Sequence, residues 1–187
     1  MEVESHPFEP FLPQGARLLM LGTFPPSEKR WSMKFYYPNF INDMWRIFGL
    51  LFFEDKDHFV DAANKCFRLD LLIPFLETQG IALFDTATRI RRTTGTASDK
   101  DLEIVEETDL RQMVRDLPQC ESIVTAGQLA TEIACRQFGA EPPKVGEYVG
   151  ITFEGRPLRL YRMPSSSRAY PMKLERKADY YRQVLRP

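Results

Sequence analysis

The sequence is poor in the two residue types that most often hold metals or form disulfides, with three cysteines and two histidines among 187 residues. Cys66, Cys120 and Cys135 are widely separated and none belongs to a CxxC pair. An odd number of scattered cysteines supports neither a disulfide framework nor a four-cysteine zinc or iron–sulfur site. His6 and His58 are too few for a histidine-rich zinc site, so we expect a protein that uses no metal and no cofactor.

Long apolar runs are also missing, because no stretch approaches the roughly 20 residues that cross a membrane as a helix. The first ten residues, MEVESHPFEP, are acidic and lack the apolar core of a secretory signal. We therefore expect a cytoplasmic protein with no membrane partner. The hydrophobic fraction of 43% and the length fit one globular domain over residues 1–187, which we expect to be a monomer.

Net charge gives no whole-protein attraction for nucleic acid, since the formal charge is -1. The charge is nevertheless unevenly distributed. Segment 156–187 carries nine basic and two acidic side chains, whereas segment 99–116 is acidic. This asymmetry fits a basic patch at the entrance to a binding site on an otherwise neutral protein, although a solvated helix face produces the same pattern.

The most informative stretch runs from residue 17 to residue 45. The apolar run Leu18–Leu21 predicts a strand covered on both faces, and Gly22 ends it where parallel sheets bind their ligands. Aromatic rings, amides and cations then follow within one loop, and such groups suit a flipped nucleobase and its phosphates. They are Lys29, Arg30, Trp31, Phe35, Tyr36, Tyr37, Asn39 and Asn42.

The rest of the chain repeats a strand–turn–helix pattern and predicts an α/β fold. We expect a three-layer α/β/α sandwich around a mostly parallel four-stranded sheet, preceded by an irregular arm over residues 1–16. Further strands are expected at 81–85, 122–125 and 157–161, the last in a hairpin with 148–153, and helices at 44–51, 58–79, 108–117, 127–138 and 172–185. Loops near 22–42, 85–101, 125–128 and 163–171 should then meet at one edge of the sheet.

Several of these segments resemble motifs of the uracil-DNA glycosylase superfamily, in the same order. Segments 22–26 (GTFPP) and 36–45 (YYPNFINDMW) are similar to motifs of its mismatch-specific and hypoxanthine-DNA glycosylase branches. Segments 81–85, 125–127 and 164–167 resemble the second-strand motif, the third-strand motif and the phosphate-gripping loop. The mismatch-specific branch has its catalytic amide at the position of Phe24, and the hypoxanthine branch has it at the position of Asn42, where Asn39 and Phe40 replace a His-Pro pair.

The resemblance implies that Asn42 directs a water at the sugar, with Asn39 as the alternate amide and Asp85 as the next candidate. Each residue also has an ordinary structural explanation. Asn42 is placed to cap a helix, Asn39 stands in a turn beside Pro38, and a carboxylate after a strand often caps the next helix.

Two further groups of residues have implied roles. Base binding is assigned to the residues around the first turn and the end of the second strand, although the aromatic ones could equally be core. DNA phosphates are assigned to the serine loop and its basic neighbours, which could instead form a stiffened surface turn. The base-binding set is Gly22, Thr23, Phe24, Phe35, Tyr36 and Asp85; the DNA-binding set is Pro164, Ser165, Ser166, Ser167, Arg168 and Lys173.

Together these features predict a monofunctional DNA-repair glycosylase that acts on DNA containing deaminated bases, uracil or hypoxanthine. Two alternatives from other classes stay open. One is a non-enzymatic module that binds damaged or single-stranded DNA through the same pocket. The other is a nucleotide-binding domain, which would gain nothing from longer DNA.

Overall fold

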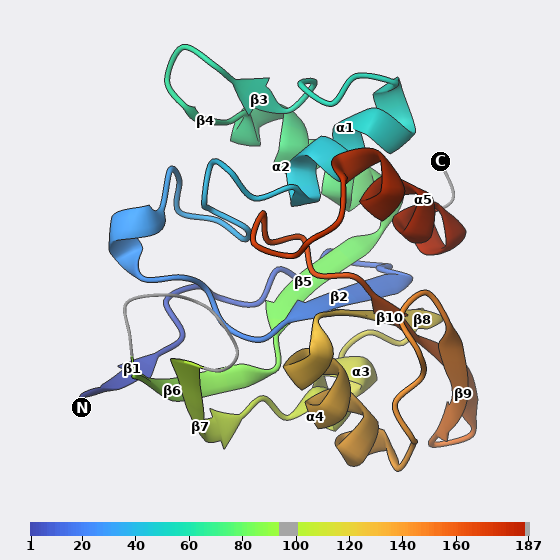
Figure 1. The fold of residues 1–187 in the computed structure, drawn as a ribbon. Coiled ribbons are helices and arrows are strands. Elements are labelled where there is room, and N and C mark those ends of the chain that lie inside the picture. The colour runs from blue at the N-terminus through green and yellow to red at the C-terminus, as the bar shows by residue number, and fades with distance from the viewer. Residues whose placement is uncertain (94–100, 186–187) are drawn as a thin grey trace.

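The computed structural model describes residues 1–93 and 101–185. Its central sheet has five strands in the order β5, β2, β8, β10, β9 (Figure 1). The first four are parallel, and β9 pairs antiparallel with β10. Their bounds are β2 Leu18–Gly22, β5 Ile81–Asp85, β8 Ser122–Ala126, β9 Tyr148–Phe153 and β10 Arg156–Met163.

The mostly parallel sheet is therefore confirmed, whereas the predicted number of four strands is wrong. The turn at Glu154 and Gly155, both with positive φ, folds β9 back onto β10 as an antiparallel edge strand. The interior strands are apolar because both of their faces are covered. Every residue of β2 and of β5 is buried.

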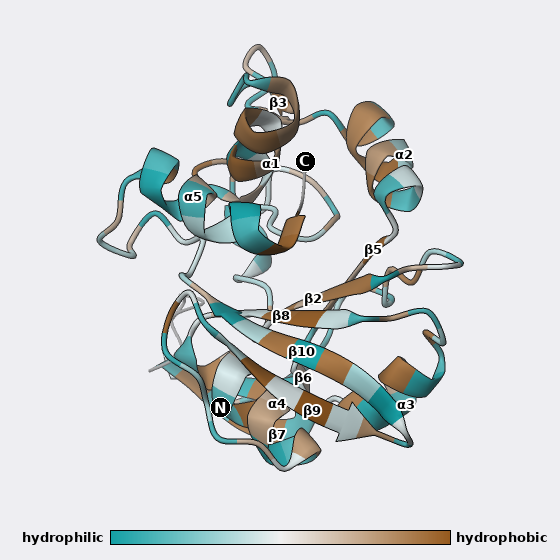
Figure 2. Cartoon of the chain, turned by 90° about the vertical axis from the view of Figure 1, so that its right-hand side faces the viewer, coloured by the Kyte–Doolittle hydropathy of each residue, from teal (hydrophilic) through white to brown (hydrophobic). Residues whose placement is uncertain are grey.

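Helices lie on both faces of this sheet. Helices α1 (Met44–Phe53), α2 (Leu69–Gln79) and α5 (Leu174–Leu185) lie on one side, and α3 (Leu110–Arg115) and α4 (Gln128–Phe138) on the other (Figures 1 and 2). Hydrophobic residues concentrate along the strands, and α5 shows a largely hydrophilic surface (Figure 2). None of the helices in the described ranges is long and apolar enough to cross a membrane.

The segment 58–79 differs from the helical segment, kinked or divided at Pro74, that its apolar spacing predicts. It forms a short hairpin, β3 (Val60–Asp61) with β4 (Cys66–Phe67), and only then the helix α2. The polar turn between the two strands explains the difference. Asp61 accepts hydrogen bonds from the backbone and side-chain nitrogens of Asn64. Lys65, in the same turn, has a φ of +48°, which a helix does not allow. Pro74 lies inside α2, which continues past it.

A second, three-stranded sheet follows the order β1, β6, β7 and is antiparallel. Its strands are β1 (Val3–Ser5), β6 (Ala87–Arg92) and β7 (Leu102–Glu107), and a short 3-10 helix, η1 (Glu28–Arg30), precedes the aromatic loop. Part of the expected irregular arm and part of the expected loop 85–101 are thus strands. The prediction for 94–100 lies outside the described residues.

The order of the parallel strands identifies the place where a ligand would bind. The chain leaves β2 toward β5 on one side and leaves β8 toward β10 on the other. Open α/β sheets bind ligands at such a switch point, outside the carboxyl ends of the two diverging strands. Gly22 ends β2 and Gly127 follows β8, so the predicted loop 22–42 begins at this crevice.

Candidate active site

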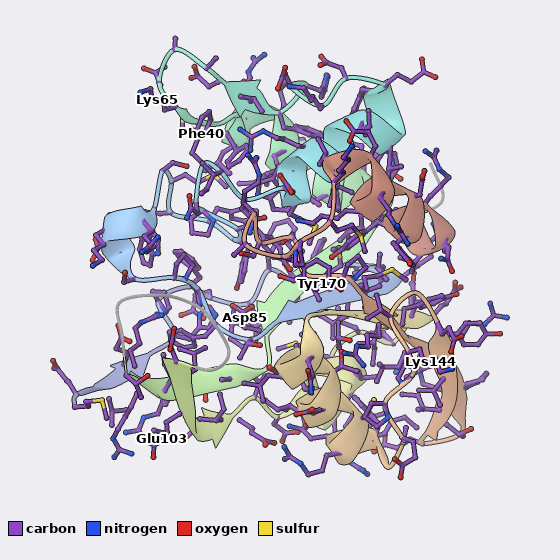
Figure 3. All side chains as sticks on the ribbon, viewed as in Figure 1. Phe40, Lys65, Asp85, Glu103, Lys144 and Tyr170 are labelled. Atoms are coloured by element: carbon purple, nitrogen blue, oxygen red, sulfur yellow. The ribbon has the colours of Figure 1, made fainter. Side chains whose placement is uncertain are left out.

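Gly22 and Asp85 face each other at the carboxyl ends of β2 and β5, where they are register partners. A Cβ on Gly22 would lie 2.9 Å from Asp85 Oδ1 and 3.8 Å from the hydroxyl oxygen of Tyr37. The first distance is shorter than ordinary atomic contacts allow. Glycine is therefore required here because it lets a carboxylate lie directly against the backbone. Figure 3 shows Asp85 at the end of β5, in the middle of the molecule.

The other oxygen of Asp85 is held by His6, a residue that no sequence motif indicated. His6 Nε2 lies 2.7 Å from Asp85 Oδ2, and the Phe8 backbone N–H donates to Nδ1 at 3.1 Å. Nδ1 also lies 3.0 Å from the Phe8 carbonyl oxygen. Because a carboxylate accepts hydrogen bonds, Nε2 is the nitrogen that donates to Asp85. The His6 side chain is only 4% exposed, and its ring lies 4.5 Å from that of Phe84 and 5.2 Å from that of Phe24. Asp85 is thus fixed from the side of the N-terminal arm.

Tyr37 is the second residue that sequence reasoning left without a role. Its φ of +53° is unusual for a bulky residue, and such backbone strain clusters at functional sites. Burial, with smaller contributions from Tyr181 and Asp85, raises the pKa of Tyr37 well above its usual value, so its phenol keeps its proton. The Tyr37 hydroxyl faces Gly22 and makes no hydrogen bond to the described part of the chain. It is a free donor beside the Asp85 carboxylate.

The predicted base-binding residues fall into two environments. Thr23, Phe24 and Tyr36 are buried next to Gly22 or around His6, and the Tyr36 hydroxyl donates to the Glu9 carbonyl at 2.6 Å. Phe24 also packs in a small second core with Ala87 and Ile90 of β6.

Phe35 lies in the main core instead. Its ring contacts those of Phe11, Tyr36 and Trp45. The structure therefore gathers most of this set around Asp85 and encloses Phe35 in aromatic packing, so a stacking role for Phe35 stays a prediction.

Both candidate amides are engaged through their side-chain oxygens. Asn42 Oδ1 accepts from the Met44 backbone N–H at 2.9 Å, and Asn39 Oδ1 accepts from the Ile41 backbone N–H at 3.2 Å. Asp43, the residue at the cap position of α1, makes no side-chain cap of its own. The Asn42 bond satisfies a backbone N–H at the start of α1 instead, and it holds the Asn42 amide in place. A carbonyl oxygen has two lone pairs, so Asn42 can still orient a water.

Asp43 connects this turn to the serine loop, which is more than 120 residues away in the sequence. The Asp43 N–H donates to the Ser166 carbonyl at 2.9 Å. The Asp43 carboxylate lies 2.9 Å from Lys177 Nζ and 3.0 Å from Arg168 Nε. Lys177 is fully buried and also donates to the Ser167 carbonyl at 2.9 Å. The Asn42 turn, the serine loop and α5 therefore form one connected unit.

Within the serine loop the hydroxyl groups have different surroundings. Ser165 and Ser167 accept from backbone N–H groups two residues further on, at 3.1 Å and 3.2 Å. Ser166 is 3% exposed, whereas Ser167, Arg168 and Lys173 are exposed. Pro164 is buried, and its carbonyl accepts from the Tyr181 hydroxyl. Buried side chains of α5 thus hold the backbone of the loop, while the cations Arg168 and Lys173 remain exposed to solvent.

The crowding at Gly22 gives a testable expectation. Gly22→Ala should destabilise the fold by about 1–3 kcal/mol, because the added methyl must displace Asp85 or the strand. Gly150→Ala on β9 is the matched control, since a Cβ there has no atom within 4 Å. Urea unfolding of both variants measures the difference. Equal stabilities would mean that Asp85 does not press on Gly22.

Comparison with protein-family models and with curated proteins finds no match for this chain. Among solved structures, the chain is similar to the solution NMR structure of a protein from Methanosarcina acetivorans described as a "putative Uracil DNA glycosylase". The TM-score is 0.65 and the identity 21%, over 99% of this chain and 98% of that chain. The two chains therefore share a fold over nearly their whole lengths.

Proposed function

We propose that this protein is a DNA glycosylase that hydrolyses the N-glycosidic bond of a flipped deaminated base, uracil or hypoxanthine. The observation that carries the proposal is the Asp85 carboxylate, which lies against Gly22 at the end of β2, next to the switch point of the sheet. One of its oxygens is fixed by His6, and the other lies against Gly22 beside the free hydroxyl of Tyr37. The fold shared with the archaeal protein supports the same class of activity.

The pairing of Asp85 with Tyr37 suits the edge that deamination creates. An ionised carboxylate only accepts hydrogen bonds, and a neutral phenol donates one. Uracil and hypoxanthine present an N–H next to a carbonyl oxygen, which is the complementary pattern. Cytosine and adenine present a ring nitrogen acceptor next to an amino group, and this reversed pattern would leave both protein groups unpaired. Such unpaired polar groups discriminate strongly against cytosine and adenine. Thymine and guanine present the same pattern as uracil and hypoxanthine and are not rejected by this pair.

Hydrolysis needs a water directed at the oxocarbenium-like sugar and stabilisation of the charge that leaves with the base. We assign the water to Asn42, whose amide is fixed at the start of α1, and keep Asn39 and Asp85 as the alternates. Water attacks the sugar carbon and becomes its hydroxyl group, the glycosidic bond breaks, and the bonding pair leaves with the base. The proton lost by the water ends on the departing base, so that the products are a neutral base and an abasic sugar. No covalent bond to the protein forms, so the proposed enzyme is monofunctional and water is its one co-reactant.

The serine loop is assigned to the DNA backbone. Arg168→Gln and Lys173→Gln should each weaken DNA binding and lower the slope of log affinity against log salt by about 1, because each removes one phosphate contact. The rate of base release at saturating protein should change little. Fluorescence anisotropy across a salt series measures both quantities. An unchanged slope in the double variant would remove this loop from the DNA-binding surface.

The function is tested with labelled oligonucleotides that carry uracil, hypoxanthine or xanthine, each single-stranded and opposite every normal base. Alkali cleavage after incubation reports abasic sites. We expect cleavage of at least one lesion and none of undamaged DNA. Lesion-selective binding without cleavage would identify a non-enzymatic DNA-binding module instead. Binding of mononucleotides with no gain from longer DNA would identify a nucleotide-binding domain.

A further inference from the structure

A groove of about 680 Å³ opens beside the Asn42 turn, between the start of α1, the β3–β4 hairpin and the loop that leads into α5. Its volume is typical of a small-ligand site. Apolar side chains line part of it, and four cations reach it from three separate segments of the chain. The cations are Arg46, Lys56, Arg168 and Lys173.

Arg46 is the most buried of these cations. It is 9% exposed, and its guanidinium carbon lies 4.9 Å from the ring centre of Phe40 and 5.3 Å from that of Phe67. One terminal nitrogen donates to the Phe40 carbonyl at 2.6 Å and to the Asn42 carbonyl at 3.0 Å. Nε and the second terminal nitrogen make no hydrogen bond to the described residues. A planar donor fork is therefore held in place with its remaining N–H groups unused.

The surrounding charges leave this fork in need of an anion. Arg46 and Arg168 line the same groove. Burial, and then the positive charge of Arg168, lowers the pKa of Arg46, against smaller opposing effects of Asp43 and Asp57. The groove also contains three carboxylates, Asp43, Asp57 and Glu175. Asp43 is already neutralised by the buried Lys177, and Asp57 by Lys56 at 3.1 Å. Arg168 also meets the Asp43 carboxylate, at 3.0 Å. Counting Lys177, five cations face three carboxylates around the groove, which leaves an excess of positive charge.

We propose that this groove binds a phosphodiester group of the DNA strand next to the flipped nucleotide, with Arg46 as a bidentate ligand and Arg168 as its partner. The inference rests on the proposed function, because it assumes that DNA crosses this edge of the sheet. Planar guanidinium groups match phosphate oxygens in pairs, which a point charge such as lysine cannot do. Arg46 also donates to the backbone carbonyl of Asn42. The phosphate contact would therefore hold the DNA strand in a fixed position relative to the candidate catalytic side-chain amide of Asn42.

The test is a set of oligonucleotides in which one phosphodiester at a time is replaced by an uncharged methylphosphonate. One position near the lesion should weaken binding to the wild-type protein by roughly 10- to 100-fold. Arg46→Gln should bind unmodified DNA more weakly by a similar factor and lose sensitivity at that same position. Arg46→Lys should restore charge but not full affinity. Lys144→Gln, an exposed lysine of the loop before β9, is the control and should leave the scan unchanged (Figure 3).

Circular dichroism checks that each variant is folded, and Arg168→Gln, at the exposed partner of Arg46, should give the same cycle without touching a buried side chain. Two results would overturn the proposal. One is that the losses of affinity from Arg46→Gln and from the methylphosphonate simply add. The other is that no methylphosphonate position weakens binding to the wild-type protein. Competition by inorganic phosphate without a sensitive DNA position would also overturn it, in favour of a free phosphate group. If Arg46→Gln and one methylphosphonate position are coupled but no base is released, the phosphate site is supported and the proposed enzymatic function is rejected. If base is released without such coupling, the enzymatic function is supported and the phosphate site is rejected.

Discussion

Asn42→Ala is expected to lower the single-turnover rate of base release by at least about 100-fold, with DNA affinity nearly unchanged. The expectation follows because a positioned group that activates or directs a nucleophile contributes roughly 10²- to 10⁴-fold. The Asn42 amide is fixed by its bond to the Met44 N–H and lies next to the turn that contacts the serine loop. Single-turnover assays at saturating protein measure the chemical step without interference from binding.

Controls separate this role from the helix cap, whose loss alone costs about 1 kcal/mol of stability. Asn42→Ser keeps an oxygen for the Met44 N–H and should recover stability but not rate. Asn39→Ala, the matched amide in the same loop, should retain most of the activity. The rate should be flat from about pH 5.5 to 8.5, because an amide does not titrate in that range. An acid-side loss that Asp85→Asn removes would transfer the role to Asp85.

The largest expected effect on stability comes from Asp43→Ala, at about 3–5 kcal/mol, because it leaves a buried ammonium group without its carboxylate. The Lys177 side chain is 0% exposed and that of Asp43 is 3% exposed. The serine loop should loosen at the same time, since Lys177 and Arg168 both meet this carboxylate. Urea unfolding gives the loss, and limited proteolysis reports the loop.

The double variant Asp43→Ala with Lys177→Met provides the matched control. It removes both charges together, so it should be more stable than Asp43→Ala alone and give a clear coupling energy in the double-mutant cycle. If Asp43→Ala costs less than about 1 kcal/mol, the pair does not fasten the loop.

The central strands and their order of appearance could be predicted from the sequence, because buried parallel strands appear as continuous apolar runs. Segments 18–22, 81–85 and 122–126 all form such strands. The segment 58–79 was harder, since its apolar spacing suits a helix while the polar stretch 61–65 favours a turn. The spacing of apolar residues cannot distinguish a helix from a hairpin here. The choice depends on the hydrogen bonds that the turn at 61–65 makes in the folded chain.

The candidate site shows the same limit more clearly. Gly22 and Asp85 stand out as the residues that end two predicted strands. His6 does not, because its partner is 79 residues away. The arm reaches the site through the pairing of β1 with β6 and of Phe11 with Leu83 of β5. The positive φ of Tyr37 likewise depends on the folded loop, so its free hydroxyl has no sequence signature.

The central claim is hydrolysis of a glycosidic bond, and mass spectrometry of the products tests it most directly. Oligonucleotides carrying uracil or hypoxanthine are incubated with the protein in ¹⁸O-labelled water under single-turnover conditions. We expect free base together with an abasic sugar that carries one ¹⁸O atom. Tight lesion-selective binding with no free base from either oligonucleotide would contradict the account.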